Sequence, residues 1–282
     1  MTLSLVMSTM ESSSQHNFGI ASPLDMAVGS YQLMVKGFSW CVSLWDQIAI
    51  TQTRFTTLPP IFLRHRVHGD VDLTSFLNVG EQCLNDLEAA LHKIDKKITD
   101  FTTILDFGCG CGRTLLWLTE RAKDAQLFGT DIDREAIAWC QTHLNAVTYT
   151  VNDALPPLAF PDAHFDLVYA ISIFTHLDAD FQHRWLGELK RITKPDGIVL
   201  ITVHGPERIR ELSPELQDEV KAKGLLFIPF PLQRGIFPEW YQLSFHTPEY
   251  AIESVSNYFQ VLAYIPLGLN QYQDLMVLKN TL

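Results

Sequence analysis

The stretch Ile104-Leu105-Asp106-Phe107-Gly108-Cys109-Gly110-Cys111-Gly112-Arg113-Thr114 decides the fold of this chain. An apolar run typical of a buried strand ends in three alternate glycines, after which a helical pattern begins. Glycine lets the backbone approach a ligand closely, and the first N–H groups of a helix have no partner within that helix. The stretch therefore predicts a ligand-binding loop between a strand and a helix.

The spacing of these glycines narrows the choice of ligand. A dinucleotide-binding loop has the pattern Gly-x-Gly-x-x-Gly. Here the third glycine, Gly112, comes one residue early, and Arg113 stands where the dinucleotide pattern needs glycine. No Gly-Lys-Ser/Thr ending follows, which excludes a phosphate-binding P-loop. The spacing disfavours an oxidoreductase that uses a dinucleotide, which stays as a competing hypothesis.

Beyond residue 100, short β-rich runs alternate with helical patterns. The strands expected are Thr102–Phe107, Gln126–Asp131, Val147–Val151, Phe165–Ala170, Gly197–Val203, Phe259–Ile265 and Tyr272–Leu278. The helices expected between them are Arg113–Ala122, Arg134–Leu144 and one capped by Asp178. This alternation predicts an α/β fold with three layers, in which helices cover both faces of a mostly parallel, seven-stranded sheet.

Two further segments frame this pattern. Residues 24–50 are apolar and aromatic, so residues 1–70 are expected to form a tail and a helical cap, and residues 71–282 the main domain. After the fifth strand the alternation is interrupted by a helix that Ser213 begins and Gly224 closes, followed by the apolar, proline-broken stretch Leu225–Phe237. We expect an insertion over about residues 205–246 to form a lid over the ligand, the alternative being a hydrophobic cluster beneath a long loop.

The glycine loop resembles motif I of the class I S-adenosylmethionine (SAM)-dependent methyltransferases, an acidic residue followed by Gly-x-Gly-x-Gly. Three further features carry the resemblance. Asp131 closes the second strand, where the family binds both ribose hydroxyls. Asn152-Asp153-Ala154 follows the third strand, where the family holds the adenine, and Phe160–Val168 is similar to the family's run into its fourth strand. The resemblance covers roughly residues 63–282.

This resemblance implies a Rossmann-like fold and SAM as cofactor. The residues that it assigns to cofactor binding are Asp106, Gly108, Gly110, Gly112, Asp131, Ile132, Asn152, Asp153, Ala154 and Ile171. An arginine could bind the methionyl carboxylate through its bidentate fork. Arg66 is the first candidate and Arg113 the second; the alternative is that these arginines pair with surface acids.

The segment after the fourth expected strand excludes two subclasses of this methyltransferase family. It reads Ile171-Ser172-Ile173-Phe174. It lacks the Asn/Asp-Pro-Pro-Tyr motif of enzymes that methylate the amino groups of bases or glutamine. It also lacks the aspartate of metal-dependent, catechol-type enzymes. We therefore expect no metal, and in particular no metal held by His176, Asp178 and Asp180 or by the paired cysteines Cys109 and Cys111.

Three histidines are candidates for the catalytic base: His176 after the fourth strand, His204 at the end of the fifth, and His246 before a helix start. A neutral imidazole, with an unperturbed pKa of ~6.5, can accept a hydroxyl proton. For each of them the alternative is a packing or capping role.

Composition sets the outer limits on function. The chain has 282 residues, 47% of them hydrophobic, and a net charge of -11, which excludes general disorder and disfavours a nucleic-acid backbone as partner. No stretch has the ~20 mostly apolar residues of a membrane span. Five cysteines without framework spacing favour a reducing compartment, so we expect a cytoplasmic protein.

The acceptor expected is a small, partly apolar metabolite, because many aromatic residues lie in the predicted cap and lid. They are Phe38, Trp40, Trp45, Phe227, Phe230, Phe237, Trp240 and Tyr241. The reaction expected is O-methylation by in-line transfer without a metal. N- or C-methylation, a catalytically silent SAM-binding module, a protein or RNA substrate and a homodimer remain as alternatives.

Overall fold

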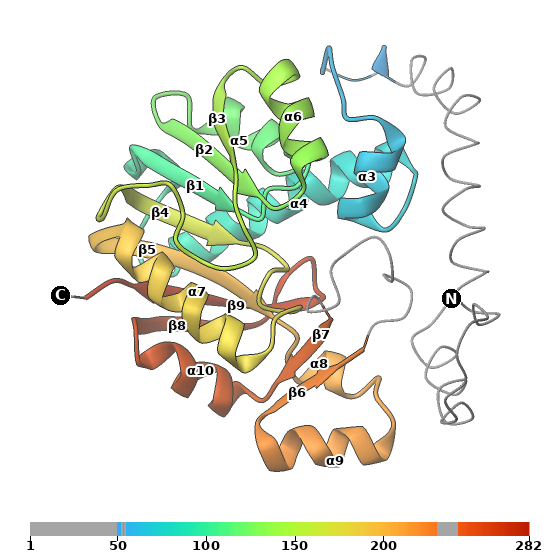
Figure 1. The fold of residues 1–282 in the computed structure, drawn as a ribbon, viewed down its shortest axis with the longest axis vertical. Helices are drawn as coiled ribbons and strands as arrows, with labels where there is room; N and C mark the ends of the chain where they lie inside the picture. The colour runs from blue at the N-terminus through green and yellow to red at the C-terminus, as the bar shows by residue number, and fades with distance from the viewer. Residues whose placement is uncertain (1–49, 52, 54, 230–241, 282) are drawn as a thin grey trace.

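The computed structural model describes residues 50–281 except 52, 54 and 230–241 (Figure 1). The helices expected over residues 24–50 therefore lie outside the described residues, apart from Ile50. So do the aromatic residues expected to cap the acceptor, except Phe227.

A seven-stranded sheet forms the centre of the described structure, in the order β3-β2-β1-β4-β5-β9-β8. The strands are β1 (Thr103–Phe107), β2 (Gln126–Asp131), β3 (Val147–Val151), β4 (Phe165–Ala170), β5 (Thr193–Val203), β8 (Gln260–Leu269) and β9 (Gln273–Lys279). β9 runs antiparallel to both of its neighbours, and the other recorded pairs in this sheet are parallel. The predicted mostly parallel sheet is confirmed.

Helices cover both faces of the sheet. One hydrophobic cluster joins it to α4 (Leu73–His92), α5 (Leu115–Arg121) and α6 (Arg134–His143). A second cluster joins it to α7 (Ala179–Ile192) and α10 (Pro248–Ser256), which are drawn in front of the sheet in Figure 1. Local signals in the sequence set the starts of these helices, since Asp72, Asp133 and Asp178 each accept a backbone N–H as N-cap.

The basic segment before the main domain is a helix, α3 (Ile61–His68), for which the sequence showed no periodic apolar face. This helix buries both an apolar residue, Leu63, and a charged residue, Arg64. The Arg64 guanidinium donates to the carbonyl of Pro59 at 2.9 Å, so a charged residue faces inward with a backbone partner. That contact depends on the fold of the preceding loop and is not visible in a hydrophobicity pattern.

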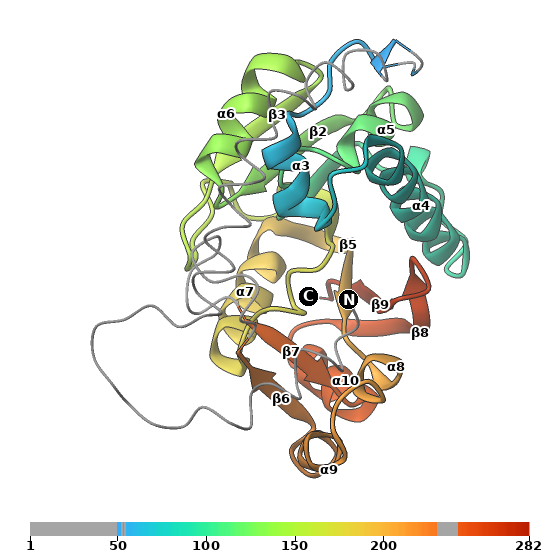
Figure 2. The same ribbon diagram turned by 90° about the vertical axis from the view of Figure 1, so that its right-hand side faces the viewer.

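The insertion after β5 contains α8 (Pro206–Ile209), α9 (Pro214–Lys223), β6 (Leu225–Ile228) and β7 (Leu243–His246). They lie together at one end of the molecule and share a hydrophobic cluster of their own (Figures 1 and 2). The sequence predicted an irregular loop from Leu225, but residues 225–228 pair antiparallel with residues 243–246. The inner pair, Ile228 with Leu243, is already fifteen positions apart, so the local sequence could not predict this pairing.

The start of β5 also differs from the prediction. The sequence indicated a turn at Pro195-Asp196 and a strand only from Gly197, whereas the strand begins at Thr193. Asp196 does adopt a left-handed conformation, with φ 64°. The pairing between β4 and β5 shifts register between Phe165 and Leu167, so the turn-forming residues are absorbed as an irregularity within the strand.

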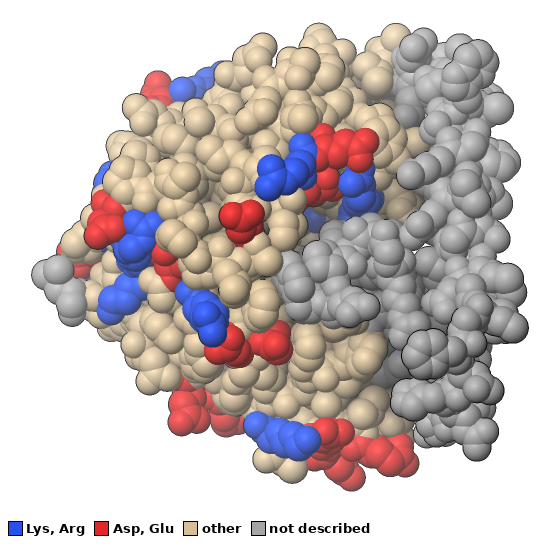
Figure 3. All heavy atoms as spheres, in the orientation of Figure 1, with Lys and Arg blue, Asp and Glu red and all other residues tan. Residues whose placement is uncertain are grey.

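Charges are mixed on the surface. On the face shown in Figure 3, Lys and Arg side chains mostly neighbour Asp and Glu rather than gathering in one patch. Among residues 50–281, apart from the undescribed positions, no helix is long and apolar enough to cross a membrane.

The packing of α4 against the sheet gives a first testable prediction. Leu84 on α4 is fully buried, so Leu84→Ala should leave a cavity and lower the free energy of unfolding by about 2–5 kcal/mol. Leu155, which is 40% exposed, provides the matched control, and Leu155→Ala should change it by less than about 1 kcal/mol. Urea unfolding followed by circular dichroism measures both. Equal losses in the two variants would contradict the assignment of α4 to the core.

Candidate functional site

The glycine loop between β1 and α5 is built on backbone conformations that only glycine adopts easily. Gly108, Gly110 and Gly112 have φ of 82°, 53° and 81°. Space is also short: a Cβ on Gly108 would lie 2.1 Å from Ile173 Cδ1, and one on Gly110 would lie 2.4 Å from Val67 Cγ2. The loop is thus enclosed by the start of the segment after β4 and by α3, at the carboxyl end of β1.

Asp131, at the end of β2, is fixed by this loop. The Gly110 N–H donates to Asp131 Oδ2 at 2.7 Å, and the Asp133 N–H donates to Oδ1 at 2.8 Å. Burial raises the pKa of the Asp131 carboxyl, and the backbone N–H of Asp133 opposes that effect. Each carboxylate oxygen has a second lone pair, so an oriented Asp131 can still accept hydrogen bonds from a pair of neighbouring hydroxyls.

A second carboxyl, Asp106, lies beneath the loop. Burial raises the pKa of Asp106 to about 8; the neighbouring Tyr169 hydroxyl acts against that rise, and the charge of Asp131 adds to it. Asp106 is only 4% exposed, so its ionised form is costly there. A cationic ligand group at the loop would favour the ionised form.

The residues expected around the adenine lie beyond β3, next to Asp131. The Asn152 amide is engaged within the protein: Thr130 Oγ1 donates to its oxygen at 3.0 Å, and its nitrogen donates to the Asp153 carbonyl at 2.8 Å. The Asp153 carboxylate is 88% exposed, with its nearest cation, Arg134, 3.9 Å away. Of the two polar side chains, Asp153 has the greater remaining capacity to accept hydrogen bonds. The apolar residues Ile132, Ala154 and Ile171 are each half-buried.

Arg66 lies on α3, where its guanidinium contacts two acids. One terminal nitrogen is 2.9 Å from Asp133 Oδ2 and the other is 2.5 Å from Glu135 Oε2. The pairing with surface acids, which the sequence left open, is therefore present at Arg66. The second candidate, Arg113, has a terminal nitrogen 3.2 Å from His68 Nδ1.

His176 and His204 lie together at the ends of β4 and β5, with ring centroids 6.2 Å apart. His176 Nδ1 is 2.6 Å from the Gln242 carbonyl, and His204 Nδ1 is 3.1 Å from the Ser244 carbonyl. A carbonyl only accepts, so both Nδ1 atoms carry a proton and both Nε2 atoms carry the lone pair. Burial lowers the pKa of His176 to about 4 and, with the charges of His176 and Arg208, holds that of His204 well below its usual value.

His246 occupies a different environment. It is 1% exposed, and its Nε2 lies 3.1 Å from the Gln182 side-chain oxygen on α7. Burial lowers the pKa of His246 to about 3. The sequence offered the three histidines as alternative bases. The structure places the rings of His176 and His204 6.2 Å apart, and puts His246 at the end of β7, where its N–H donates to the His204 carbonyl at 2.8 Å while its ring faces Gln182.

The sequence missed a polar pair at the same edge, Ser172 and Gln273. Ser172 adopts φ 59°, a strained conformation for a residue other than glycine. Its N–H donates to Thr202 Oγ1 at 2.8 Å, and its hydroxyl oxygen is 2.8 Å from Gln273 Nε2. Nothing in Ile-Ser-Ile signals a left-handed residue, because the strain is held by contacts from β5 and β9.

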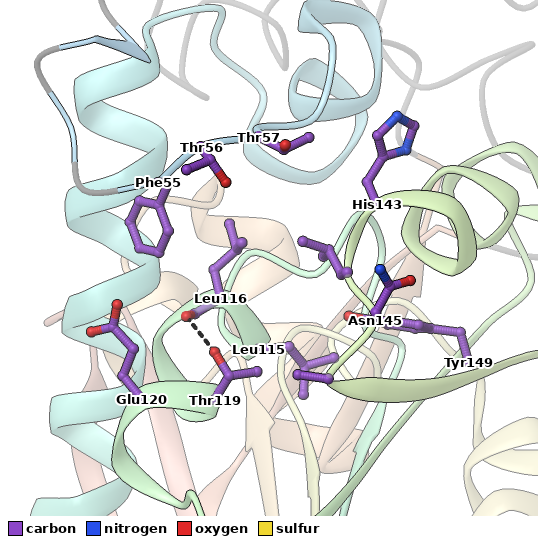
Figure 4. Close-up of a pocket in the computed structure, with 12 residues that line it drawn as sticks. Phe55, Thr56, Thr57, Leu115, Leu116, Thr119, Glu120, His143, Asn145 and Tyr149 are labelled. Carbon is purple, nitrogen blue, oxygen red and sulfur yellow. Dashed lines mark hydrogen bonds between the residues drawn. The ribbon is translucent and has the colours of Figure 1, made fainter.

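A separate cavity of ≈ 260 Å³ lies away from these residues (Figure 4). It is enclosed by Phe55–Thr57, by α5 and by the connection from α6 to β3, where His143 and Asn145 stand at its rim. Within the described part of the chain, no group of three or more His, Cys, Asp or Glu side chains is arranged to hold a metal ion. Cys83, Cys109, Cys111 and Cys140 are free and buried, as small core residues.

Comparison with known families gives the site its context. Residues 104–197, from β1 to the start of β5, match the family described as a methyltransferase domain. A phosphoethanolamine N-methyltransferase from Plasmodium falciparum is 24% identical over 132 residues, which are 46% of this chain and 49% of that protein. A demethylmenaquinone methyltransferase from Thermus thermophilus is 33% identical over 124 residues, 43% of this chain and 52% of that one. The chain thus spans about half the length of these curated relatives.

Solved structures show the same fold. A SAM-dependent methyltransferase from Clostridium acetobutylicum aligns with a TM-score of 0.52 at 11% identity, over 86% of this chain and 99% of that one. A protein from Pyrococcus horikoshii aligns with a TM-score of 0.51 at 22% identity, over 70% and 89%. The matched domain, the sheet order and the glycine loop with its aspartate agree: residues 104–197 match a methyltransferase domain, and the sheet has the Rossmann-like fold of the SAM-dependent methyltransferase from Clostridium acetobutylicum.

Proposed function

We propose that this protein transfers a methyl group from SAM to a hydroxyl oxygen of a small, partly apolar molecule, without a metal and with a histidine as base. The observation that carries the proposal is the juxtaposition of two groups of residues at one edge of the sheet. The glycine loop follows β1, and Asp131 is the last residue of β2. His176 lies in the segment after β4, and His204 directly follows β5. A cofactor bound by the glycine loop and Asp131 would therefore lie next to the two histidines.

The residues present fit SAM. Asp131 would accept the two ribose hydroxyls, because its carboxylate is oriented by Gly110 and Asp133 and keeps lone pairs. The exposed Asp153 carboxylate would accept from the adenine amino group. Asp106 would face the positively charged end of SAM, and that charge would favour the ionised form of the Asp106 carboxyl. Ile132, Asn152, Ala154 and Ile171 would complete the walls. For the methionyl carboxylate, Arg66 would have to give up a partner acid.

When bound, SAM supplies an activated methyl group carried by a sulfonium. The chain's own residues then have two tasks. Asp131 and the glycine loop fix the cofactor, while His176 or His204 takes the hydroxyl proton at Nε2, the atom that holds the lone pair. At neutral pH both histidines are in the neutral form that this role needs, since burial depresses their pKa values. His246 would hold the wall behind them through Gln182.

Several observations support a small molecule as the acceptor. Within the described part of the insertion, β7 lies beside the ends of β4 and β5, because Phe245 forms a bridge with His204 and the Ser244 N–H donates to the Thr175 carbonyl at 2.8 Å. The face in Figure 3 carries mixed charges rather than a basic patch. The two relatives reported above are named for phosphoethanolamine and demethylmenaquinone. Free buried cysteines suit the cytoplasm, our proposed location.

One observation favours N-methylation as a second candidate. With a pKa of about 4, His176 is a weak base for an alcohol or a phenol. A neutral amine needs no base before it attacks, so the same site would serve it without a proton acceptor. Variants of the histidine pair distinguish the two reactions.

The cofactor assignment is tested by calorimetric titration with SAM, its demethylated product S-adenosylhomocysteine, and NAD. Asp131→Asn should weaken SAM binding roughly tenfold to hundredfold, the effect of losing charged hydrogen bonds to the ribose. Asp218→Asn, an exposed acid on α9 paired with Lys221, is the matched control and should bind as the wild type does. No binding of SAM by the wild type would overturn the proposed function, and binding of NAD in its place would favour an oxidoreductase.

The base is tested with His176→Gln and His204→Gln. Removal of the true base should lower kcat for an O-methyl acceptor by about 10²–10⁴ with little change in SAM affinity. The acid limb of the kcat profile should fall only as the pH drops toward about 4, because a histidine with a lowered pKa stays neutral above that value. Full activity in both variants would argue against a histidine base, whereas a limb near pH 6.5 would contradict the lowered pKa of that base.

A further inference from the structure

Arg208 is a buried cation with incomplete partners. It lies on α8, four residues after His204, and is 6% exposed. Its Nη1 donates to Glu211, a carboxylate whose side chain is 42% exposed. Its Nε is buried and has no hydrogen-bond partner among the described residues. The guanidinium is therefore paired at one end only, with an acid that is itself partly in solvent.

The partners of Arg208 do not fully offset the free-energy cost of burying its charge. A buried polar N–H without a partner is rare, and burying a charge is costly unless opposite charge and hydrogen bonds compensate for it. Glu211 compensates in part, since solvent screens its charge. A second anionic group that accepted from Nε would complete both the hydrogen bonds and the charge balance of Arg208.

The position of this cation links it to the acceptor side of the site. Arg208 Cζ lies 4.0 Å from the centroid of the Tyr272 ring, at a distance typical of a cation–π contact. The same ring meets His204 edge-on, with centroids 6.0 Å apart. Tyr272 is 44% exposed, so a ligand can reach it. Cation, aromatic ring and histidine thus form one cluster at the end of β5, which we call the Arg208–Tyr272 platform; Tyr272 is its exposed member, whereas Arg208 and His204 are buried.

We propose that the acceptor carries an anionic oxygen group, a carboxylate or a phosphate, which binds Arg208 while the apolar part of the acceptor lies on Tyr272. This inference rests on the proposed function and names its substrate class. In this arrangement the nucleophilic group of the acceptor points toward His204. About the width of an aromatic ring separates that group from the anionic group of the acceptor. The arginine fork suits both carboxylate and phosphate. The charge of Arg208 also helps to keep His204 neutral.

The experiment compares ligands that differ only at the proposed anchor. Hydroxyphenyl compounds of one skeleton are used in three forms, as the carboxylate, the phosphate monoester and the uncharged primary amide. Their binding is measured by saturation-transfer NMR titration, with and without S-adenosylhomocysteine. An anionic form should bind about tenfold or more tighter than the amide, the expected effect of a charge-assisted contact. The better of the two anions identifies the group. Equal binding of the anions and the amide, or failure of both anions to bind, overturns the inference.

Variants locate the effect. Arg208→Gln should abolish the preference for the anion, and Arg208→Lys, which keeps the charge but loses the fork, should retain part of it. Arg210→Gln is the matched control, because Arg210 is exposed on the same turn and pairs with Glu207. Persistence of the anion preference in Arg208→Gln would contradict the assignment. Thermal unfolding of each variant checks that the insertion is intact.

The two proposals fail in different ways. If S-adenosylhomocysteine does not bind, the proposed function is wrong, while the comparison made without it still decides whether Arg208 binds an anion. If S-adenosylhomocysteine binds and the anions show no advantage over the amide, the methyltransferase proposal stands and the substrate class is wrong.

Discussion

The hydrogen bond from the Gly110 N–H to the Asp131 carboxylate is the contact on which the site depends. It joins the end of β1 to the end of β2, and it is available only because the glycine loop bends through three left-handed residues. The bend turns a backbone N–H toward the neighbouring strand instead of along the helix. Asp131 is thereby held in one orientation, and α3 and the segment after β4 close in around the loop through Val67 and Ile173.

The opposite half of the site is governed by burial. His176 and His204 each give their Nδ1 proton to a backbone carbonyl beside β7, which fixes the tautomer and leaves the lone pair on Nε2. The surroundings oppose a charge on either ring. The insertion supplies those carbonyls through Gln242 and Ser244, so this segment sets the tautomer of both histidines. Its Arg208 adds the buried positive charge next to them.

Much of the fold was predictable because its signals are local. Short β-rich runs predicted β2, β3 and β4 at their observed bounds, and Asp178 predicted the start of α7. The predictions were wrong where the structure of a segment depends on partners far away in the sequence. β6 forms because β7 pairs with it, and α3 packs through Arg64, whose guanidinium donates to a loop carbonyl. Neither partner can be read from the segment itself, since a propensity describes a residue and its nearest neighbours only.

The sequence by itself determined the candidate cofactor site of this protein: the spacing of Gly108, Gly110 and Gly112, and the acid at the end of the next strand, are local patterns tied to strand ends. Only the tertiary structure decided the rest. It paired the ring of His246 with Gln182 and the ring of His176 with that of His204, engaged Arg66 with Asp133 and Glu135, and brought Tyr272 between His204 and Arg208. The physical reason is that these groups come from segments far apart in the chain, so their distances, burial and charge state exist only once β5, β9 and the insertion have packed together.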